Sequence, residues 1–308
     1  MALPDSPQQQ LDWEARHRTR AAIAAAIAAV GILGGQILEQ VIDGGAPAPP
    51  LLGALQKLAA PGTIYDQPTA QVAYAQYLSD HAAELIASRA LAGLGFVGLA
   101  YAVTFLAAAT RARRPQFARW AFYVPMVSAV VFAVAWVAGG AGRVADANGV
   151  VDGEGTIGSV QDVGASGITE VSRVLLTPAA LALTVGLVLV SLNAMRTGLL
   201  TRFMGALGIV AGVLQVIQYG AALPLVQTFW LAGLALLFAG RRPGGDPPAW
   251  RTGRAEPWPS AQQAAAARRE QQQGEPPPDA HPEPPRERER APAGARPATA
   301  KRKRKRRD

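Results

Sequence analysis

The fold class follows from residues 193–250, NAMRTGLLTRFMGALGIVAGVLQVIQYGAALPLVQTFWLAGLALLFAGRRPGGDPPAW. Thirty-eight consecutive residues between Arg202 and Arg241 carry no charge, and Pro224 divides them into two apolar runs. A bilayer requires runs of this kind, whereas soluble domains rarely contain them. The stretch therefore predicts a membrane hairpin with both ends on one side, within an all-α polytopic transmembrane helical bundle.

Charge divides the chain at Gly240. Residues 1–240 carry thirteen basic and thirteen acidic residues, whereas residues 241–308 carry seventeen and nine, so the net charge of +8 lies in the second part. The basic isoelectric point therefore describes a tail, and we do not expect a nucleic-acid-binding domain. The absence of cysteine excludes disulfides, thiol catalysis and thiolate metal sites.

Six apolar runs predict about six spans within residues 21–240. Their approximate bounds are 21–42, 90–109, 120–141, 174–192, 203–222 and 225–239. A further helix is expected to begin near Thr69 and to continue into the second span. Because the fifteen residues of the last run reach only about 22 Å across a hydrocarbon core of about 30 Å, a re-entrant hairpin is the alternative for the last two spans.

Lysine and arginine are alternately abundant and scarce in the segments that connect these spans. The positive-inside rule then assigns residues 1–20 and 241–308 to the cytoplasm, and loops 43–89 and 142–173 to the outside of the plasma membrane. The basic cluster before the first apolar run also occurs in signal peptides, and residues 46–48 form an A-x-A-like site. We favour an uncleaved first helix, because the apolar core is too long for a signal peptide.

Two glycine pairs have the GxxxG spacing. Gly31 and Gly35 lie in the first span, and Gly208 and Gly212 lie in the fifth. This spacing lets helix backbones approach closely, although it also arises by chance in helices rich in alanine and glycine.

Polar side chains gather near the predicted outer ends of the spans. They are Gln36, Glu39, Gln40, Arg89, Arg173, Gln215, Gln218 and Tyr219. Such groups usually face the bundle or extend to the interface, so anchoring with interhelical hydrogen bonds is one interpretation. A cavity open to the outside is the other. In both cases we expect Glu39 to face Arg89 or Arg173.

Motifs for metal binding and catalysis are absent from the sequence. Asp80, His81 and Glu84 could form only a weak metal or proton site, and residues 146–154 lack the closing glutamate of a calcium loop. There is no P-loop, HExxH or Ser-His-Asp grouping. We therefore expect no metal, no cofactor and no enzymatic activity.

The composition of residues 241–308 predicts a disordered tail. It ends in seven consecutive cations, Lys301, Arg302, Lys303, Arg304, Lys305, Arg306 and Arg307. Anionic lipid is the favoured partner, at about 1 kcal/mol per basic residue near an anionic surface. An acidic protein and a merely solvated charge run are alternatives, and nucleic acid is disfavoured because no aromatic residues interrupt the run.

Two segments, AMRTGLLTRFMGALGIVAGVL from Ala194 and RRPGGDPPAWRTGRAEPWPS from Arg241, resemble uncharacterised actinobacterial six-span integral membrane proteins. The resemblance covers roughly residues 170–260. It implies a membrane topology and no catalytic residue, since the function of that family is unknown.

Two classes of function fit these observations. The first is a non-enzymatic membrane component or scaffold whose basic tail contacts anionic lipid or an acidic partner. The second is a small-solute or lipid carrier that uses the outer polar cluster. An internal repeat would favour the carrier, and the sequence shows none.

Overall fold

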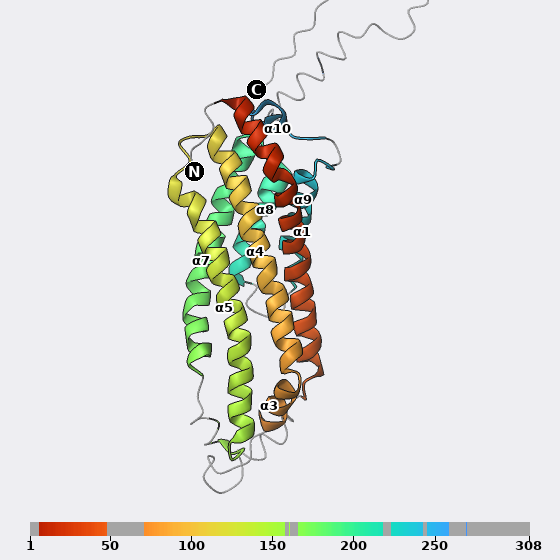
Figure 1. The fold of residues 1–308 in the computed structure, drawn as a ribbon, viewed down its shortest axis with the longest axis vertical. Coiled ribbons are helices and arrows are strands. Elements are labelled where there is room, and N and C mark those ends of the chain that lie inside the picture. The colour runs from red at the N-terminus through yellow and green to blue at the C-terminus, as the bar shows by residue number, and fades with distance from the viewer. Residues whose placement is uncertain are drawn as a thin grey trace, which may run out of the picture. The chain divides into compact units, whose positions relative to one another are not determined.

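The computed structural model describes residues 6–47, 71–157, 160, 166–217, 223–242, 245–258 and 269. Regular secondary structure in these ranges is helical, without strands (Figure 1). The helices are α1 (Pro7–Gly45), α3 (Gln71–Asp80), α4 (Ala82–Arg113), α5 (Arg119–Asp152), α7 (Gly167–Arg196), α8 (Arg202–Ile217), α9 (Leu225–Phe238) and α10 (Pro248–Thr252). The predicted all-α fold class is confirmed for this part of the chain.

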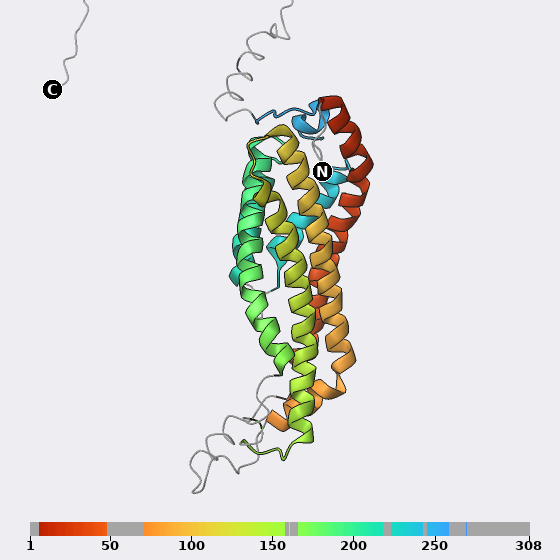
Figure 2. The same ribbon diagram turned by 60° about the vertical axis from the view of Figure 1, so that its left-hand side comes forward.

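Four of these helices, α1, α4, α5 and α7, are long and apolar enough to cross a membrane. They contain 30 to 39 residues, which at about 1.5 Å per residue gives lengths of about 45 to 58 Å and exceeds the hydrocarbon core of about 30 Å. They lie side by side along one axis (Figures 1 and 2). We name the two ends of the bundle after residues of α1, the Glu14 end and the Glu39 end.

The outer surface of the bundle is apolar along the long helices. Val30 on α1, Leu94 on α4 and Val134 on α5 are each exposed over more than 60% of their surface. Soluble monomers rarely expose large contiguous apolar patches, because such surface is unfavourable in water. The surface suits contact with hydrocarbon.

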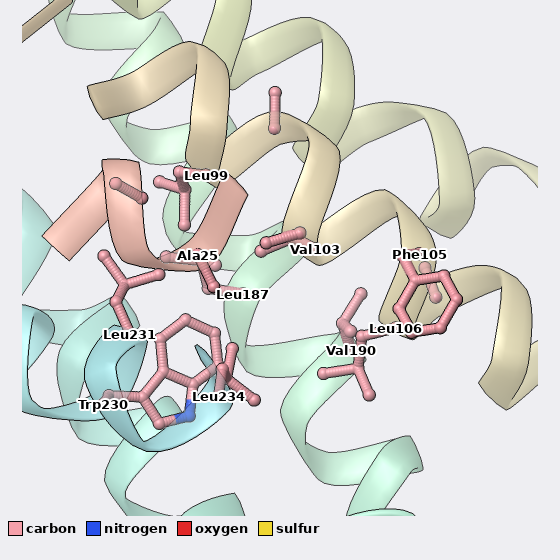
Figure 3. Close-up of a cluster of buried hydrophobic side chains, with 14 of the residues drawn as sticks. Ala25, Leu99, Val103, Phe105, Leu106, Leu187, Val190, Trp230, Leu231 and Leu234 are labelled. Atoms are coloured by element: carbon pink, nitrogen blue, oxygen red, sulfur yellow. The ribbon is translucent and has the colours of Figure 1, made fainter. Parts of the chain in front are cut away.

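The interior is closely packed where α1, α4, α7 and α9 meet (Figure 3). Ala25, Leu99 and Leu187 are fully buried there. Trp230 of α9 is also fully buried, and its indole N–H donates to the carbonyl oxygen of Met204 at 3.2 Å. The small side chain of Ala25 leaves room for α9, so α9 is part of the core and not a peripheral helix.

Helix α1 begins fourteen residues earlier than the first predicted span. The side chain of Ser6 caps it by accepting from the N–H of Gln9 at 3.3 Å, and Pro7 occupies the first turn, where its missing N–H costs little. Residues 7–20, which the positive-inside rule assigns to the cytoplasm, therefore continue the helix away from the apolar run.

Much of the predicted loop 142–173 is also helical, since α5 continues to Asp152 and α7 begins at Gly167. Frequent glycine suggested a loop, but here glycine serves helix packing. A Cβ atom added to Gly142 would collide with the hydroxyl of Thr169. The non-helical part of the predicted connection is therefore shorter than residues 142–173, and Gly142 lies where a larger side chain would not fit.

The helix predicted to begin near Thr69 is present from Gln71 and turns at His81, which separates α3 from α4. The Nδ1 atom of His81 donates to the carbonyl oxygen of Tyr77 at 2.9 Å, and the two rings stack with centroids 4.1 Å apart. The imidazole of His81 is thus bound to the preceding turn of its own helix.

The predicted spans 203–222 and 225–239 correspond to α8 and α9, which contain 16 and 14 residues and extend about 24 and 21 Å. Helix α8 begins at the Glu14 end, and helix α9 ends there. A Cβ atom added to Gly212 would lie 3.3 Å from the carbonyl oxygen of Thr184, near the middle of α7. One added to Gly208 would lie 2.7 Å from the indole nitrogen of Trp230. Both glycines of this pair lie at close contacts, and the hairpin extends about half the length of α7.

The other glycine pair lies where α1 packs against α4. A Cβ atom added to Gly31 would lie 2.8 Å from the carbonyl oxygen of Leu91. One added to Gly35 would lie 2.5 Å from the carbonyl oxygen of Ser88 and 2.8 Å from Cβ of Ala92. Real Cβ atoms do not approach a backbone carbonyl this closely, so the α1–α4 packing requires glycine at both positions.

We expect Gly35→Ala to destabilise the protein and the neighbouring Gly34→Ala to stabilise it. The first substitution must displace backbone atoms of α4, at a cost of about 1 to 3 kcal/mol. A Cβ atom on Gly34 meets only the side chain of Leu91, at 3.4 Å, and alanine is favoured over glycine in a helix by about 0.5 to 1 kcal/mol. Thermal unfolding in mild detergent measures both, and shifts of the same sign would contradict this packing.

Candidate functional site

At the Glu39 end, three helices bring charged side chains into one network. Glu39 of α1 accepts hydrogen bonds from Arg89 of α4 and from Nη1 of Arg143 of α5, the latter at 3.0 Å. Nη2 of Arg143 donates to Asp43 at 2.9 Å and to the hydroxyl of Tyr74 at 3.0 Å. We call Glu39, Asp43, Tyr74, Arg89 and Arg143 the Glu39 network.

The centre of this network is largely buried. The side chains of Glu39 and Arg89 are 11% and 12% exposed. The guanidinium of Arg89 also lies over the ring of Trp136, 4.0 Å from its centroid, in a cation–π contact. Removing one charge from such a pair leaves the other uncompensated, so each ion holds its partner in place.

From the sequence, Glu39 was expected to face Arg89 or Arg173. The contact with Arg89 is present, and the contact with Arg143 was not predicted. Arg143 was assigned to a loop, although the run from Arg143 to Val150 contains no proline and could extend the preceding helix. That absence of proline was the available signal.

The other described members of the predicted polar cluster lie on α1, α7 and α8. Arg173 forms an exposed ion pair with Glu170 at 3.2 Å. Gln36 and Gln40 are half-buried on α1, and Gln215 is buried on α8 in the short hairpin. Gln218, Tyr219 and the seven cations at 301–307 lie outside the described residues, so the predictions for them stay predictions.

A cavity of about 530 Å³ lies beside the network, between α3 and α5. Gln71, Tyr74, Arg143 and Asp146 line it with polar groups, while Leu78 and Val150 are among its apolar residues. Its volume is within the range of small-molecule sites, about 300 to 1,000 Å³.

In residues 146–154, which were compared with a calcium loop, the first carboxylate, Asp146, has a structural role. Asp146 accepts from the backbone N–H of Ser166 and from the hydroxyl of Thr169, both at 2.7 Å, and so holds the start of α7. Within the described ranges, no group of three or more potential ligands is placed to hold a metal ion.

A second charged site is buried at the Glu14 end. Arg113 of α4 donates through Nη1 and Nη2 to the two carboxylate oxygens of Glu14 of α1, with Nη2 and Oε2 3.0 Å apart. The amide of Gln10 donates to Glu14 at 2.6 Å. Bidentate pairs of this kind are strong and geometrically specific. Neither ion was singled out from the sequence, because both lie in polar segments that flank the apolar runs.

This ion pair also binds a later segment of the chain, residues 245–258, which we call the strap. Nε and Nη2 of Arg113 donate to the carbonyl oxygen of Ala249 at 3.2 and 2.7 Å. The N–H of Glu256 donates to the carbonyl oxygen of Thr197 at 3.1 Å. The prediction that disorder begins at residue 241 is therefore wrong for the strap.

The strap is anchored by Trp250, whose ring enters the Glu14 end. The ring stacks on Phe105 and meets Phe238 edge-on, with centroids 5.9 and 6.0 Å away. The guanidinium of Arg18 lies 5.2 Å from its centroid. Its indole N–H donates to the carbonyl oxygen of Leu199 at 2.9 Å. One side chain thus joins the strap to α1, α4, α9 and the turn after α7.

Comparisons of the chain with models of known protein families, with curated proteins and with solved structures find no match. The resemblance of residues 170–260 to actinobacterial integral membrane proteins therefore stays a prediction. Function has to be inferred from the geometry described above.

We expect Glu39→Gln and Arg89→Gln to be energetically coupled. Glu39→Gln should cost more, on the order of 3 kcal/mol, because it leaves both Arg89 and Arg143 without their shared carboxylate. Arg89→Gln should cost less, because Arg143 still neutralises Glu39. The double variant should be more stable than the sum of the single effects predicts, by about 1 kcal/mol or more in detergent unfolding.

The exposed pair formed by Glu170 and Arg173 provides the control. Its side chains are 50% and 67% exposed, and solvent-exposed pairs typically contribute less than about 1 kcal/mol. The same cycle on this pair should give nearly additive effects. Additivity in both cycles would show that the Glu39 network contributes no specific coupling.

Proposed function

We propose that the chain is a multi-pass plasma-membrane protein without catalytic activity, which holds a basic tail at the cytoplasmic face for contact with anionic lipid or an acidic partner. The docking of the strap on the Glu14 end carries this proposal. Because Arg113 and Trp250 bind the strap, the chain after Trp258 begins at that end of the bundle. Fifty residues follow Trp258, and they include the basic run 301–307.

The charges of the two ends support the orientation. Among the described residues, thirteen arginines and four carboxylates lie at the Glu14 end, against three arginines and eight carboxylates at the Glu39 end. The thirteen are Arg16, Arg18, Arg20, Arg111, Arg113, Arg114, Arg119, Arg196, Arg202, Arg241, Arg242, Arg251 and Arg254. The positive-inside rule makes the Glu14 end cytoplasmic.

In this orientation α1, α4, α5 and α7 cross the bilayer, and the hairpin of α8 and α9 enters from the cytoplasmic side and returns. Over their described residues, α8 and α9 contain 16 and 14 residues, fewer than the about 20 that a full crossing needs. Both termini are then cytoplasmic, as the alternation of basic and neutral connections predicts.

A carrier is the second candidate, and the cavity beside Arg143 is the observation in its favour. Two features disfavour it. The charges of Glu39 and Arg89 are already paired with each other, and α1 and α4 approach at backbone distance around Gly31 and Gly35. A pathway between these two helices would require the longest contact in the bundle to open.

The orientation can be tested by labelling single cysteines in intact cells, since the native chain contains none. Glu154→Cys at the Glu39 end should react with a membrane-impermeant maleimide. Gln116→Cys, in the turn between α4 and α5, should react only after permeabilisation. Both positions are exposed, unlike Arg113, which is buried in its ion pair. The reverse pattern would overturn the proposed topology.

Leu225→Cys tests the hairpin in the same assay. Leu225 begins α9 at the inner end of the hairpin and is exposed on the bundle surface. A hairpin of partial depth keeps this position within hydrocarbon, so we expect no labelling from outside. Labelling as fast as at Glu154→Cys would instead show six full crossings.

We expect a peptide of residues 286–308 to sediment with vesicles that contain phosphatidylglycerol and to be released as salt rises, because exposed charges are screened. The matched control has glutamine at each of positions 301–307. Equal sedimentation of the two peptides, or equal binding to neutral vesicles, would rule out an electrostatic lipid contact by the run.

A further inference from the structure

A groove with a volume of about 670 Å³ lies between α1 and α9 at the Glu14 end. Its wall includes Arg18, Ala22 and Ile23 from α1, together with Phe238 and Arg241 from the end of α9. The groove shares no residue with the Glu39 network. No role described above uses it.

The upper part of the groove is cationic. Arg18 donates through Nη2 to Asp246 and to the carbonyl oxygen of Leu237, both at 2.8 Å, while its Nε is buried without a partner among the described residues. Arg241 is exposed at the mouth. Arg18 and Arg241 outnumber the single carboxylate of Asp246.

The remaining acidic group of the groove does not cancel this charge. Glu14 lines the groove, but both of its carboxylate oxygens are bound by Arg113. The charged groups that face the groove therefore leave one net positive charge. A positive site beside a membrane attracts an anionic headgroup more strongly than a zwitterionic one.

The lower part of the groove is apolar and continues toward the lipid-facing surface. Ala22 and Phe238 form its floor, and Ile23 lines it while being 55% exposed. One helical turn further along α1, Ile27 is also exposed. A molecule seated here would have its charged group beside Arg18 and Arg241 and its apolar part against α1, facing hydrocarbon.

We infer that this groove binds one anionic phospholipid of the cytoplasmic leaflet. Its phosphate interacts with Arg18 and Arg241, and an acyl chain lies along Ala22 and Ile23. Guanidinium groups suit this role, since they donate several hydrogen bonds to phosphate oxygens. The inference rests on the proposed membrane orientation, and it assigns a lipid site in the helical bundle that is independent of the tail.

The test measures lipid retention by native mass spectrometry of full-length protein, extracted from membranes in mild detergent and titrated with phosphatidylglycerol or phosphatidylcholine. All versions carry glutamine at positions 301–307, so that the basic run does not contribute. The reference protein should retain phosphatidylglycerol in preference to phosphatidylcholine. Arg18→Gln combined with Arg241→Gln should weaken phosphatidylglycerol retention about tenfold, the equivalent of about 1.4 kcal/mol.

Two further variants separate the groove from general charge and from misfolding. Arg251→Gln combined with Arg254→Gln removes two exposed arginines of the strap at the same end and should leave retention unchanged. Thr19→Trp fills the exposed mouth of the groove while keeping every charge, and it should weaken retention as the Arg18 and Arg241 variant does. The strap variant and Thr19→Trp should unfold at temperatures close to that of the reference protein. Arg18→Gln also loses the contacts with Asp246 and Leu237, so Thr19→Trp, which keeps them, decides whether lost retention reports the groove.

Three results would overturn the inference. They are equal retention of the two lipids by the reference protein, equal losses in the two double-arginine variants, and full displacement of the lipid by sn-glycerol 3-phosphate, which lacks acyl chains. The proposed function fails separately, if the chain does not fractionate with membranes or if the cysteine labels show the reverse orientation. A correctly inserted protein without lipid preference would contradict only the groove.

Discussion

The structure depends on the register of α1 against α4, which two ion pairs fix at opposite ends of the contact. Glu14 meets Arg113, and Glu39 meets Arg89. The carboxylates are 25 residues apart on α1 and the arginines 24 residues apart on α4, so both separations are about 36 to 38 Å. A hydrocarbon core of about 30 Å fits between the pairs, and each pair then lies at the level of a headgroup region.

The other elements are positioned by this helix pair. Close approach around Gly35 brings α1 and α4 together, and α5 is joined to them where Arg143 shares Glu39 with Arg89. At the opposite end, Arg113 binds the strap through Ala249, while Arg18 binds both the end of α9 and Asp246 of the strap. The same few ions therefore set the helix register and determine where the C-terminal region leaves the bundle.

Apolar runs predicted the helical class and six spans, of which four correspond to long apolar helices in the structure, because hydrocarbon imposes a strong and local demand on composition. The contact between Glu39 and Arg89 could be predicted from the sequence, because few charged residues lie near the ends of the spans and the possible partners are few. The Glu14–Arg113 pair could not be predicted, because the two residues are 99 positions apart and both lie in polar segments with many other charged residues. The strap was not predicted, because residues 241–308 were judged by their average composition, in which proline and glycine dominate. That average gives no weight to a single residue such as Trp250, which anchors the strap through its ring and its indole N–H.

Under the proposed topology, the α8–α9 hairpin enters only the cytoplasmic leaflet, which gives the described bundle unequal cross-sections in the two leaflets. In the proposed orientation, six described helices pass through the cytoplasmic leaflet and four through the outer one. With helices about 10 Å wide, the excess is on the order of 150 to 200 Å². In this orientation the described bundle is therefore wider in the inner leaflet, and its insertion displaces more lipid from the inner monolayer, which favours membrane that is convex toward the cytoplasm.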